Sequence, residues 1–426
     1  MLNIKQPKKV YIYTFPHCRR RNIDAAWMGE YFKKNGWQLT QSIKEADLLM
    51  CNSCAYVKEK EEASIKKIKM LKENKKKDAL LIVCGCLPDI NKPRLDTVFE
   101  GISFGPRSLD RLDKIISAKI SINEVKEPNV FDICQFSREN IFDKFLLNFE
   151  FSMTFFFKVF ESILKSICKA LGVKNKNIYT AIDYQPAEIY YLDKDAFWIR
   201  IAEGCLSSCT YCIERFATGK VSSKPLEEII GVFQEGLNKG YKKFSLIATD
   251  CGAYGQDIGL DLHTLLKRIF ECEGDYRISV LDVHPKWLIG DFERLKKLLK
   301  ANEDKIDYIN FPVQSVSERV LKMMNREYTM GELKPKLIEL KKEIPSLKLI
   351  THIIVGFPGE TEKDFHDTLD FIKNFKFEGV FFNKCTEGNN TLASQMPNRI
   401  PRIIKDKRLL QARLFYKKQV LFGGKK

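Results

Sequence analysis

Short runs of β-branched and aromatic residues alternate along the chain with longer segments in which apolar residues recur every three or four positions. In the N-terminal part, the runs cover residues 8–15, 46–53 and 79–86, and the helical patterns lie around residues 23–35 and 58–74. Strands that alternate with helices usually pair in parallel and are covered by helices. We therefore expect residues 1–125 to form a three-layer α/β domain with a parallel sheet.

The same alternation resumes after residue 190 and continues for six units. The predicted strands cover residues 196–201, 242–248, 277–283, 308–313, 347–355 and 379–384. Helical patterns fill most of the gaps, for example at 225–240 and 362–375. A series of βα units this long predicts a partial (β/α)6 barrel of the TIM type over residues 191–400, with its chemistry at the C-terminal ends of the strands.

Two further segments do not follow the α/β pattern. Within a linker at 126–190, polar residues at three- and four-residue spacing line one face of an expected helix at 141–171, and the rest of that helix is broadly apolar. The apolar face either packs on the protein's own domains or docks on a membrane surface or a partner. The segment 401–426 is predicted to be a basic helix or tail.

Composition and charge narrow the class of protein. The chain has 426 residues, 44% hydrophobic and 30% charged, which is typical of soluble globular proteins. Its net charge of +16 suggests an acidic partner such as nucleic acid or a membrane surface. Thirteen cysteines without an N-terminal signal peptide favour a cytoplasmic protein whose cysteines bind metal rather than form disulfides. No apolar run approaches the roughly 18 residues of a membrane-spanning helix.

A cysteine motif follows the first predicted barrel strand. In EGCLSSCTYCIERF, Cys205, Cys209 and Cys212 are separated by three and two residues; we call them the barrel trio. Three interpretations are open: a structural metal with a distant fourth ligand, loop cysteines without metal, or a [4Fe–4S] cluster with one open iron. A zinc site would normally add a nearby histidine and a ferredoxin-type cluster a fourth cysteine, and the sequence offers neither close by. The spacing favours the open cluster.

A second set, Cys18, Cys54 and Cys86, follows the three predicted strands of the N-terminal domain; we call it the strand-end trio. The carboxyl ends of parallel strands lie at one edge of the sheet, where open α/β sheets bind ligands, so these three cysteines could meet. Cys51 and Cys84, inside the strands, are expected to be buried as small hydrophobic residues. The cysteines without ligand spacing, which we expect to be structural, are Cys134, Cys168, Cys251, Cys272 and Cys385.

The barrel trio, with Tyr211 before its last cysteine, resembles the signature of the radical S-adenosylmethionine (radical SAM) superfamily. Four later blocks are similar to the methylthiotransferase family, which includes enzymes that modify tRNA and a ribosomal protein. These blocks are TDCGAYGQD (249–257), NFPVQSVSERVLKMMNREYT (310–329), IIVGFPGETEKDFHDTLDFI (353–372) and MPNRIP (396–401). In the N-terminal domain, CNSCAYVKEKEEASI and IVCGCL are similar to the family's cysteine-bearing segments. The resemblance covers most of residues 8–405.

The resemblance implies a radical SAM methylthiotransferase with two [4Fe–4S] clusters and S-adenosylmethionine as cofactors. The barrel trio would hold the cluster whose open iron binds S-adenosylmethionine, and an electron passed to the sulfonium would give a carbon radical that removes hydrogen from a C–H bond. The strand-end trio would hold an auxiliary cluster that carries the inserted sulfur. Tyr211, Gln314 and Gly356 are expected near the cofactor, and no catalytic residue beyond the cluster ligands is predicted.

The family also implies partners. The expected substrate is tRNA adenosine; the alternative is a sulfur-insertion enzyme that acts on a protein, peptide or small molecule. A reductant such as flavodoxin or ferredoxin would supply electrons. Family members usually end in an RNA-binding TRAM domain, and the segment 401–426 is too short to form one, so we expect none here.

Several residues depart from the family pattern near the first cysteine. His17 stands where the family usually has Gly, and Arg21 stands where it usually has Asn, whereas Asp24 keeps its expected offset. Cys18 is therefore the ligand with the weakest support from its flanking residues. Val316 also replaces an expected Gly in a loop of the barrel.

Overall fold

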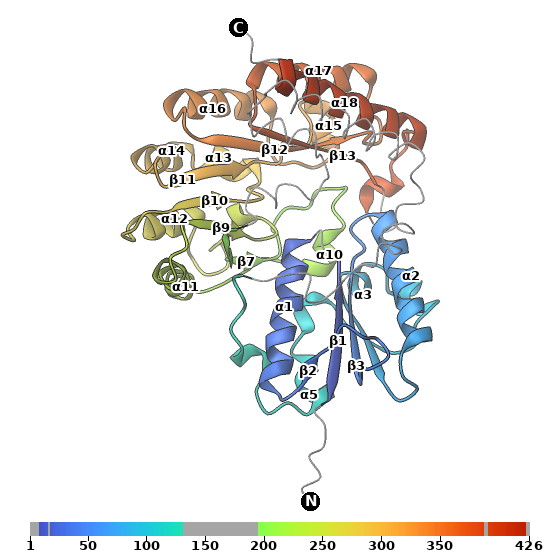
Figure 1. The fold of residues 1–426 in the computed structure, drawn as a ribbon. Helices are drawn as coiled ribbons and strands as arrows, with labels where there is room; N and C mark the ends of the chain where they lie inside the picture. Colours follow the sequence, from blue (N-terminus) through green and yellow to red (C-terminus); the bar gives the residue numbers. More distant parts are fainter. Residues whose placement is uncertain (1–7, 16–17, 131–194, 387–390, 423–426) are drawn as a thin grey trace, which may run out of the picture. The chain divides into compact units, whose positions relative to one another are not determined.

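The computed structural model describes residues 8–15, 18–130, 195–386 and 391–422, and the chain divides into two compact units (Figure 1). The first comprises the described residues within Met1–Arg138, Ala196–Leu265 and Thr386–Ser394, and the second those within Glu139–Asp195, Leu266–Cys385 and Gln395–Lys426. The expected helix at 141–171, most of the predicted linker, His17, Cys134 and Cys168 fall outside the described residues. The domain boundaries drawn from the sequence stay predictions.

The N-terminal part of the first unit contains a parallel sheet of five strands in the order β2-β1-β3-β4-β5. The strands are β1 (Lys9–Thr14), β2 (Gln38–Leu39), β3 (Leu48–Ser53), β4 (Leu80–Gly85) and β5 (Ile102–Ser103). The helices are α1 (Arg19–Lys34), α2 (Lys58–Asn74), α3 (Leu87–Ile90), α4 (Lys92–Asp96) and α5 (Arg111–Ile116), with 3-10 turns η1 (Pro106–Ser108) and η2 (Ile122–Glu124). The three predicted strands are confirmed, but α1 begins at Arg19 rather than near residue 23.

Strand residues alternate between two apolar cores, one on each face of this sheet. In β3, Leu49 and Cys51 pack on the side of α2, whereas Leu48 and Met50 pack on the side of α1. Both cores are closed by helical apolar residues, among them Ile68 of α2 on one side and residues of α1 on the other. Side chains of adjacent strand residues point to opposite faces, so a strand covered on both sides is apolar throughout. The predicted three-layer α/β arrangement is confirmed.

The remaining strands also alternate with helices. In the first unit, β6 (Phe197–Arg200) pairs in parallel with β9 (Lys243–Ile247), and between them lie β7 (Ala202–Glu203), α10 (Glu214–Thr218), β8 (Ser222–Ser223) and α11 (Leu226–Asn238). The turn η4 (Cys251–Ala253) and helix α12 (Leu262–Phe270) follow β9, and η5 is Leu392–Gln395. None of the helices in the described ranges has the length and apolarity needed to cross a membrane.

In the second unit, four strands pair in parallel in chain order: β10 (Arg277–Val280), β11 (Ile306–Asn310), β12 (Lys348–Val355) and β13 (Gly379–Lys384). Its helices are α13 (Pro285–Gly290), α14 (Phe292–Ala301), α15 (Glu318–Met323), α16 (Met330–Glu343), α17 (Glu362–Phe375) and α18 (Arg402–Phe422). All six predicted barrel strands are therefore present as β6 and β9 to β13, and helices intervene as expected for a radical SAM fold.

Gly85, the last residue of β4, lets the chain turn directly before Cys86. Its φ of +89° lies in the region that favours glycine, and a Cβ atom there would be 2.4 Å from the Ser53 carbonyl oxygen and 2.5 Å from Asn52 Oδ1. The Cys86 N–H donates to the same Ser53 carbonyl at 2.9 Å. Close approach of β3 and β4 thus fixes the backbone from which Cys86 projects.

Gly85→Ala should destabilise the first unit more than Gly36→Ala. Gly36 has a similar φ of +82°, but a Cβ atom there would meet nothing within 4 Å. Both substitutions add backbone strain of about 1–2 kcal/mol, whereas only the first also forces β3 and β4 apart. Thermal unfolding followed by circular dichroism measures the difference, and equal losses of stability would contradict the close-approach argument.

Candidate active site

The strand-end trio lies at one edge of the parallel sheet. Cys54 directly follows β3, Cys86 directly follows β4, and Cys18 precedes the first residue of α1, which follows β1. β1, β3 and β4 are neighbours in the sheet. The three thiols are close enough to interact electrostatically: after burial, Cys18 contributes to the raised pKa of Cys54, and both contribute to the raised pKa of Cys86. The structure thus brings together the three cysteines that the sequence placed at strand ends.

The barrel trio lies in a loop whose ends are joined by a short antiparallel pair, β7 and β8. Gly204 has a φ of +88°, and a Cβ atom there would be 2.1 Å from the Lys220 carbonyl oxygen, so the two ends of the loop approach closely. The Cys205 N–H donates to the Gly219 carbonyl at 3.1 Å. The Ser207 N–H in turn donates to Cys205 Sγ at 3.3 Å. These backbone bonds therefore hold Cys205 in place.

Burial raises the pKa of thiols in both trios. Burial and then Asp250 raise the pKa of Cys205 to about 11, and burial and then Glu214 raise that of Cys212 to about 12. Burial also raises the pKa of Cys54 to about 12. Such thiols would stay protonated at neutral pH, and a bound cationic centre would stabilise their thiolate forms. The all-sulfur donor sets and their burial fit iron–sulfur clusters.

A single metal ion needs ligands that meet at one point, which is a different requirement from binding a cluster. Across the described ranges, no three His, Cys, Asp or Glu side chains lie close enough together to hold one metal ion. In a [4Fe–4S] cluster each thiolate binds a different iron atom, so its ligands do not need to converge in that way. The two trios suit a cluster better than a structural zinc ion, whose four ligands surround one atom.

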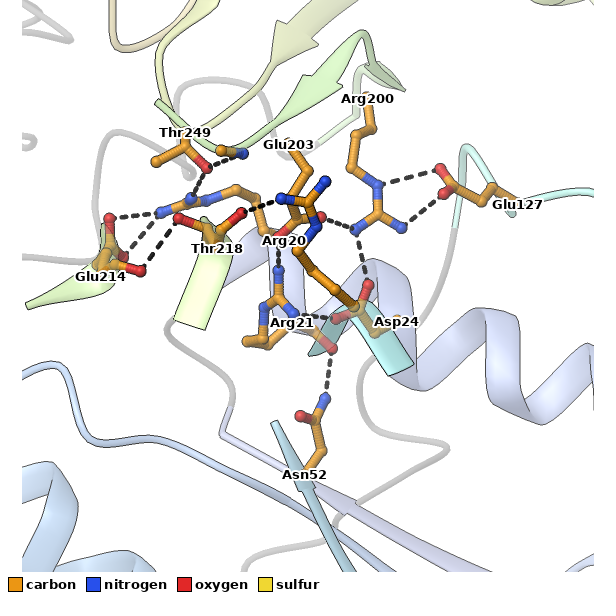
Figure 2. A network of polar contacts seen from close by, with 12 residues as sticks. Arg20, Arg21, Asp24, Asn52, Glu127, Arg200, Glu203, Glu214, Thr218 and Thr249 are labelled. Atoms are coloured by element: carbon orange, nitrogen blue, oxygen red, sulfur yellow. Dashed lines mark hydrogen bonds and ion pairs between the residues drawn. The ribbon is translucent and has the colours of Figure 1, made fainter. Parts of the chain in front are cut away.

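Charged residues connect the segments that carry the two trios (Figure 2). Nη2 of Arg20, two residues after Cys18, donates to both carboxylate oxygens of Glu214 at 2.8 Å, and Glu214 is two residues after Cys212. Nη1 of Arg20 donates to Thr249 Oγ1 at 2.7 Å. The same hydroxyl oxygen accepts from the Gly204 N–H at 3.1 Å. The start of α1 is thereby bonded to both ends of the barrel trio's loop.

Arg21 belongs to a second, more deeply buried part of the same network. Its guanidinium pairs with Asp24 at 2.6 Å and with Glu203, and Arg200 pairs with Asp24 at 2.7 Å and Glu203 at 3.0 Å. Burial opposes ionisation of Glu203, but Arg21 and Arg200 outweigh it and lower the pKa of this carboxyl to about 2. Three cations, Arg21, Arg200 and Lys224, thus face three carboxylates, Asp24, Glu203 and Glu127. Buried charge of both signs is balanced, as burial requires.

The sequence alone did not reveal this network, although one signal was present. Arg19, Arg20 and Arg21 occupy the first turn of α1, which contains no acidic residue. Cations at a helix N-terminus are opposed by the helix dipole and by one another, so three arginines there require carboxylates from elsewhere in the fold. Arg21, where this chain departs from the family pattern, is paired with carboxylates in the structure, and Asp24 carries one of them.

The other residues singled out in the sequence differ in how deeply they are buried. Cys51, Cys84, Cys251 and Cys385 are buried, as expected for structural cysteines, and every cysteine that the structure describes is a free thiol. Tyr211 lies between two cysteines of the barrel trio and is partly exposed.

Gln314 and Gly356 both belong to the second unit and have positive φ angles of 69° and 75°. Backbone bonds between Gln314 and β12 hold Gln314, and a Cβ atom on Gly356 would be 2.5 Å from Lys405 Cγ. Close packing against Lys405 is enough to explain the glycine at position 356. The cofactor roles of these two residues and of Tyr211 stay predictions.

Comparison with known proteins decides the family. Residues 199–372 match the model of the radical SAM superfamily, and residues 9–104 match the one described as uncharacterized protein family UPF0004. The ribosomal protein uS12 methylthiotransferase RimO of Clostridium botulinum is 30% identical over 380 residues, which cover 88% of this chain and 74% of the relative. This chain belongs to the radical SAM methylthiotransferase family.

Other relatives have different substrates in their names. The tRNA-2-methylthio-N(6)-dimethylallyladenosine synthase of Caldicellulosiruptor saccharolyticus is 30% identical over 94% of this chain and 76% of its own. A probable threonylcarbamoyladenosine tRNA methylthiotransferase of Pyrococcus horikoshii is 29% identical over 95% of this chain and 83% of its own. The solved structure of the radical SAM methyltransferase TsrM from Kitasatospora setae is similar in fold alone, with a TM-score of 0.54 and 12% identity over 89% of this chain and 75% of that one.

The predicted chemistry is confirmed at the level of the family. The protein is a radical SAM methylthiotransferase, and its cofactors are S-adenosylmethionine and two [4Fe–4S] clusters. The family resemblance of the cysteine motifs and the later sequence blocks had implied both the enzyme class and the cofactors.

Arg200→Gln should destabilise the methylthiotransferase by about 3–5 kcal/mol, because it leaves Asp24, Glu203 and Glu127 buried with too little positive charge. The matched control is Arg94→Gln, which removes a surface guanidinium bonded to both oxygens of Glu62 with both side chains 41% exposed. It should cost less than about 1 kcal/mol. Urea unfolding of the two variants checks the difference, and similar small losses would show that the buried network is not needed for stability.

Proposed function

We propose that this methylthiotransferase inserts a methylthio group into a C–H bond of a tRNA adenosine. The observation that carries the proposal is the presence of two cysteine trios, each with one buried and two partly buried thiols, in one compact unit of a chain from this family. Two of the relatives described above are named for methylthio modification of tRNA adenosines, which supports the substrate class. The net charge of +16 suits a polyanionic partner.

The barrel trio is the proposed ligand set for the cluster that binds S-adenosylmethionine, and the strand-end trio is the proposed ligand set for the auxiliary cluster. When bound, the first cluster and S-adenosylmethionine supply the hydrogen abstraction that opens the C–H bond. The chain's own residues orient the ligands. Loop bonds fix Cys205, and the strand ends fix Cys54 and Cys86.

The basic segment at the C-terminus contributes less free charge than its sequence implies. Residues 399–426 carry ten Lys or Arg against one acid. In α18, however, Lys405 and Arg408 are buried: Lys405 Nζ donates to the Cys385 carbonyl at 3.1 Å, and Arg408 pairs with Glu360 at 2.6 Å. The exposed basic residues whose placement is described, such as Arg402, Lys407 and Lys418, are those suited to phosphate contacts.

Electrons for the reaction come, in this proposal, from a small reductant such as flavodoxin or ferredoxin. The proposed location is the cytoplasm, where tRNA and ribosomes are modified. A protein substrate is the second candidate, and it is favoured by the relative named as a ribosomal protein uS12 methylthiotransferase.

The cluster assignment predicts about eight irons per chain after anaerobic reconstitution, since each [4Fe–4S] cluster contributes four. Replacing all three cysteines of either trio by Ala should reduce this to about four, because one ligand set is lost. Cys272→Ala, which removes a thiol bonded only within its own unit, should leave the iron content unchanged. Iron and sulfide assays with Mössbauer spectra measure the result, and only four irons in the intact protein would sink the assignment of two clusters.

The substrate assignment predicts that deleting the gene removes a methylthio-adenosine from bulk tRNA and that the wild-type gene restores it. A Cys212→Ala gene should not restore it, since the barrel trio would be incomplete. Mass spectrometry of digested tRNA measures the nucleoside, and the same cells provide ribosomal protein S12 for intact-mass analysis. Unchanged tRNA together with an S12 protein lighter by a methylthio group would favour the second candidate instead.

A further inference from the structure

The Arg20–Glu214 ion pair joins the chain segments that carry the two cysteine trios (Figure 2). Each partner is two residues beyond a cysteine: Arg20 follows Cys18, and Glu214 follows Cys212. A single nitrogen, Nη2 of Arg20, contacts both carboxylate oxygens of Glu214 at 2.8 Å, and the side chains are 9% and 24% exposed. The Nη1 bond to Thr249 at 2.7 Å also fixes the guanidinium, and a largely buried pair is weakly screened by solvent.

The Glu214 charge acts on thiols of both trios, and the Arg20 charge acts in the opposite direction on Cys18. After burial, which is the largest cause, the Glu214 carboxylate contributes to the raised pKa of all three thiols in the strand-end trio and of Cys212 in the barrel trio. Arg20 has the opposite effect and lowers the pKa of Cys18. Because Arg20 Nη2 lies 2.8 Å from both Glu214 oxygens, the guanidinium partly cancels the field of the carboxylate while the pair is intact.

We propose that the Arg20–Glu214 pair sets the reduction potentials of the clusters bound by the two trios. The proposal rests on the cluster assignment made under the proposed function. One-electron reduction adds a negative charge to a cluster that its thiolates already make negative, so a nearby cation favours reduction and a nearby anion opposes it. Net charge and hydrogen bonding around the sulfurs are general determinants of these potentials. Arg20 and Glu214 are positioning residues, since neither takes part in the chemistry.

The opposite signs of the two charges give a test that a structural role alone would not pass. Arg20→Gln should lower the midpoint potentials, because it leaves the Glu214 carboxylate without its counter-charge. Glu214→Gln should raise them, because it leaves the guanidinium alone. We expect at least a tenfold change in the ratio of reduced to oxidised cluster at a fixed potential, which is 59 mV for a one-electron couple. In the double variant, the midpoint potentials should return close to those of the intact protein.

The measurement is an anaerobic redox titration of the reconstituted full-length protein at pH 8, followed by electron paramagnetic resonance. Arg20→Lys keeps the charge and should keep potentials near those of the intact protein, which separates charge from the loss of a side chain. Arg94→Gln, on the surface pair with Glu62, should cause no shift.

Two outcomes would overturn the proposal: shifts of the same sign in both single variants, or no shift in either while both clusters are bound. Iron content is measured on the same samples. Fewer than about eight irons in the intact protein would instead overturn the cluster assignment itself. The two failures are therefore distinguishable.

Discussion

The burial of positive charge at the start of α1 is the constraint on which the first unit depends. Three consecutive arginines follow Cys18 and occupy the first turn of the helix, where the helix dipole disfavours cations. Two of them, Arg20 and Arg21, are buried. A buried guanidinium is tolerated only beside carboxylates with good geometry, and in this fold Glu203 and Glu214, which flank the barrel trio, supply carboxylates in addition to Asp24 of α1. Charge neutralisation therefore connects the two cysteine-bearing segments within one compact unit.

The network also has a chemical consequence. Glu203 and Glu214 flank the barrel trio two residues before its first cysteine and two residues after its last. Each carboxylate would raise the cost of ionising nearby thiols, and each is paired with an arginine from α1. The same ion pairs that hold the loop thus reduce the negative field at the ligands. The same few residues therefore hold the loop in place and determine the electrostatic field at the cysteines.

Within the family, the residues around Cys18 are where this chain departs from the expected pattern. Arg21 in place of Asn does not stand alone, because Asp24, Glu203 and Arg200 surround it in a balanced group of charges. Cys18 itself keeps its position at the strand-end edge beside Cys54 and Cys86. Arg21 is therefore compatible with a ligand role for Cys18, since Asp24 and Glu203 neutralise its charge.

The sequence by itself determined the enzyme class and the cofactors, through its resemblance to a known family, and every described strand of four or more residues. Apolar runs locate strands that are buried on both faces, and closely spaced cysteines carry their chemistry in a few adjacent residues, so both can be recognised locally. Strands β2, β5, β7 and β8 were missed because two residues are too few to show a pattern.

Only the tertiary structure decided which acid pairs with which arginine. Arg20 and Glu214 are separated by 194 positions, and Arg200 and Asp24 by 176. Ion pairs of this range have no sequence period. They form because the sheet edge and the cysteine loop are folded against each other, and burial then requires each charge to have a partner.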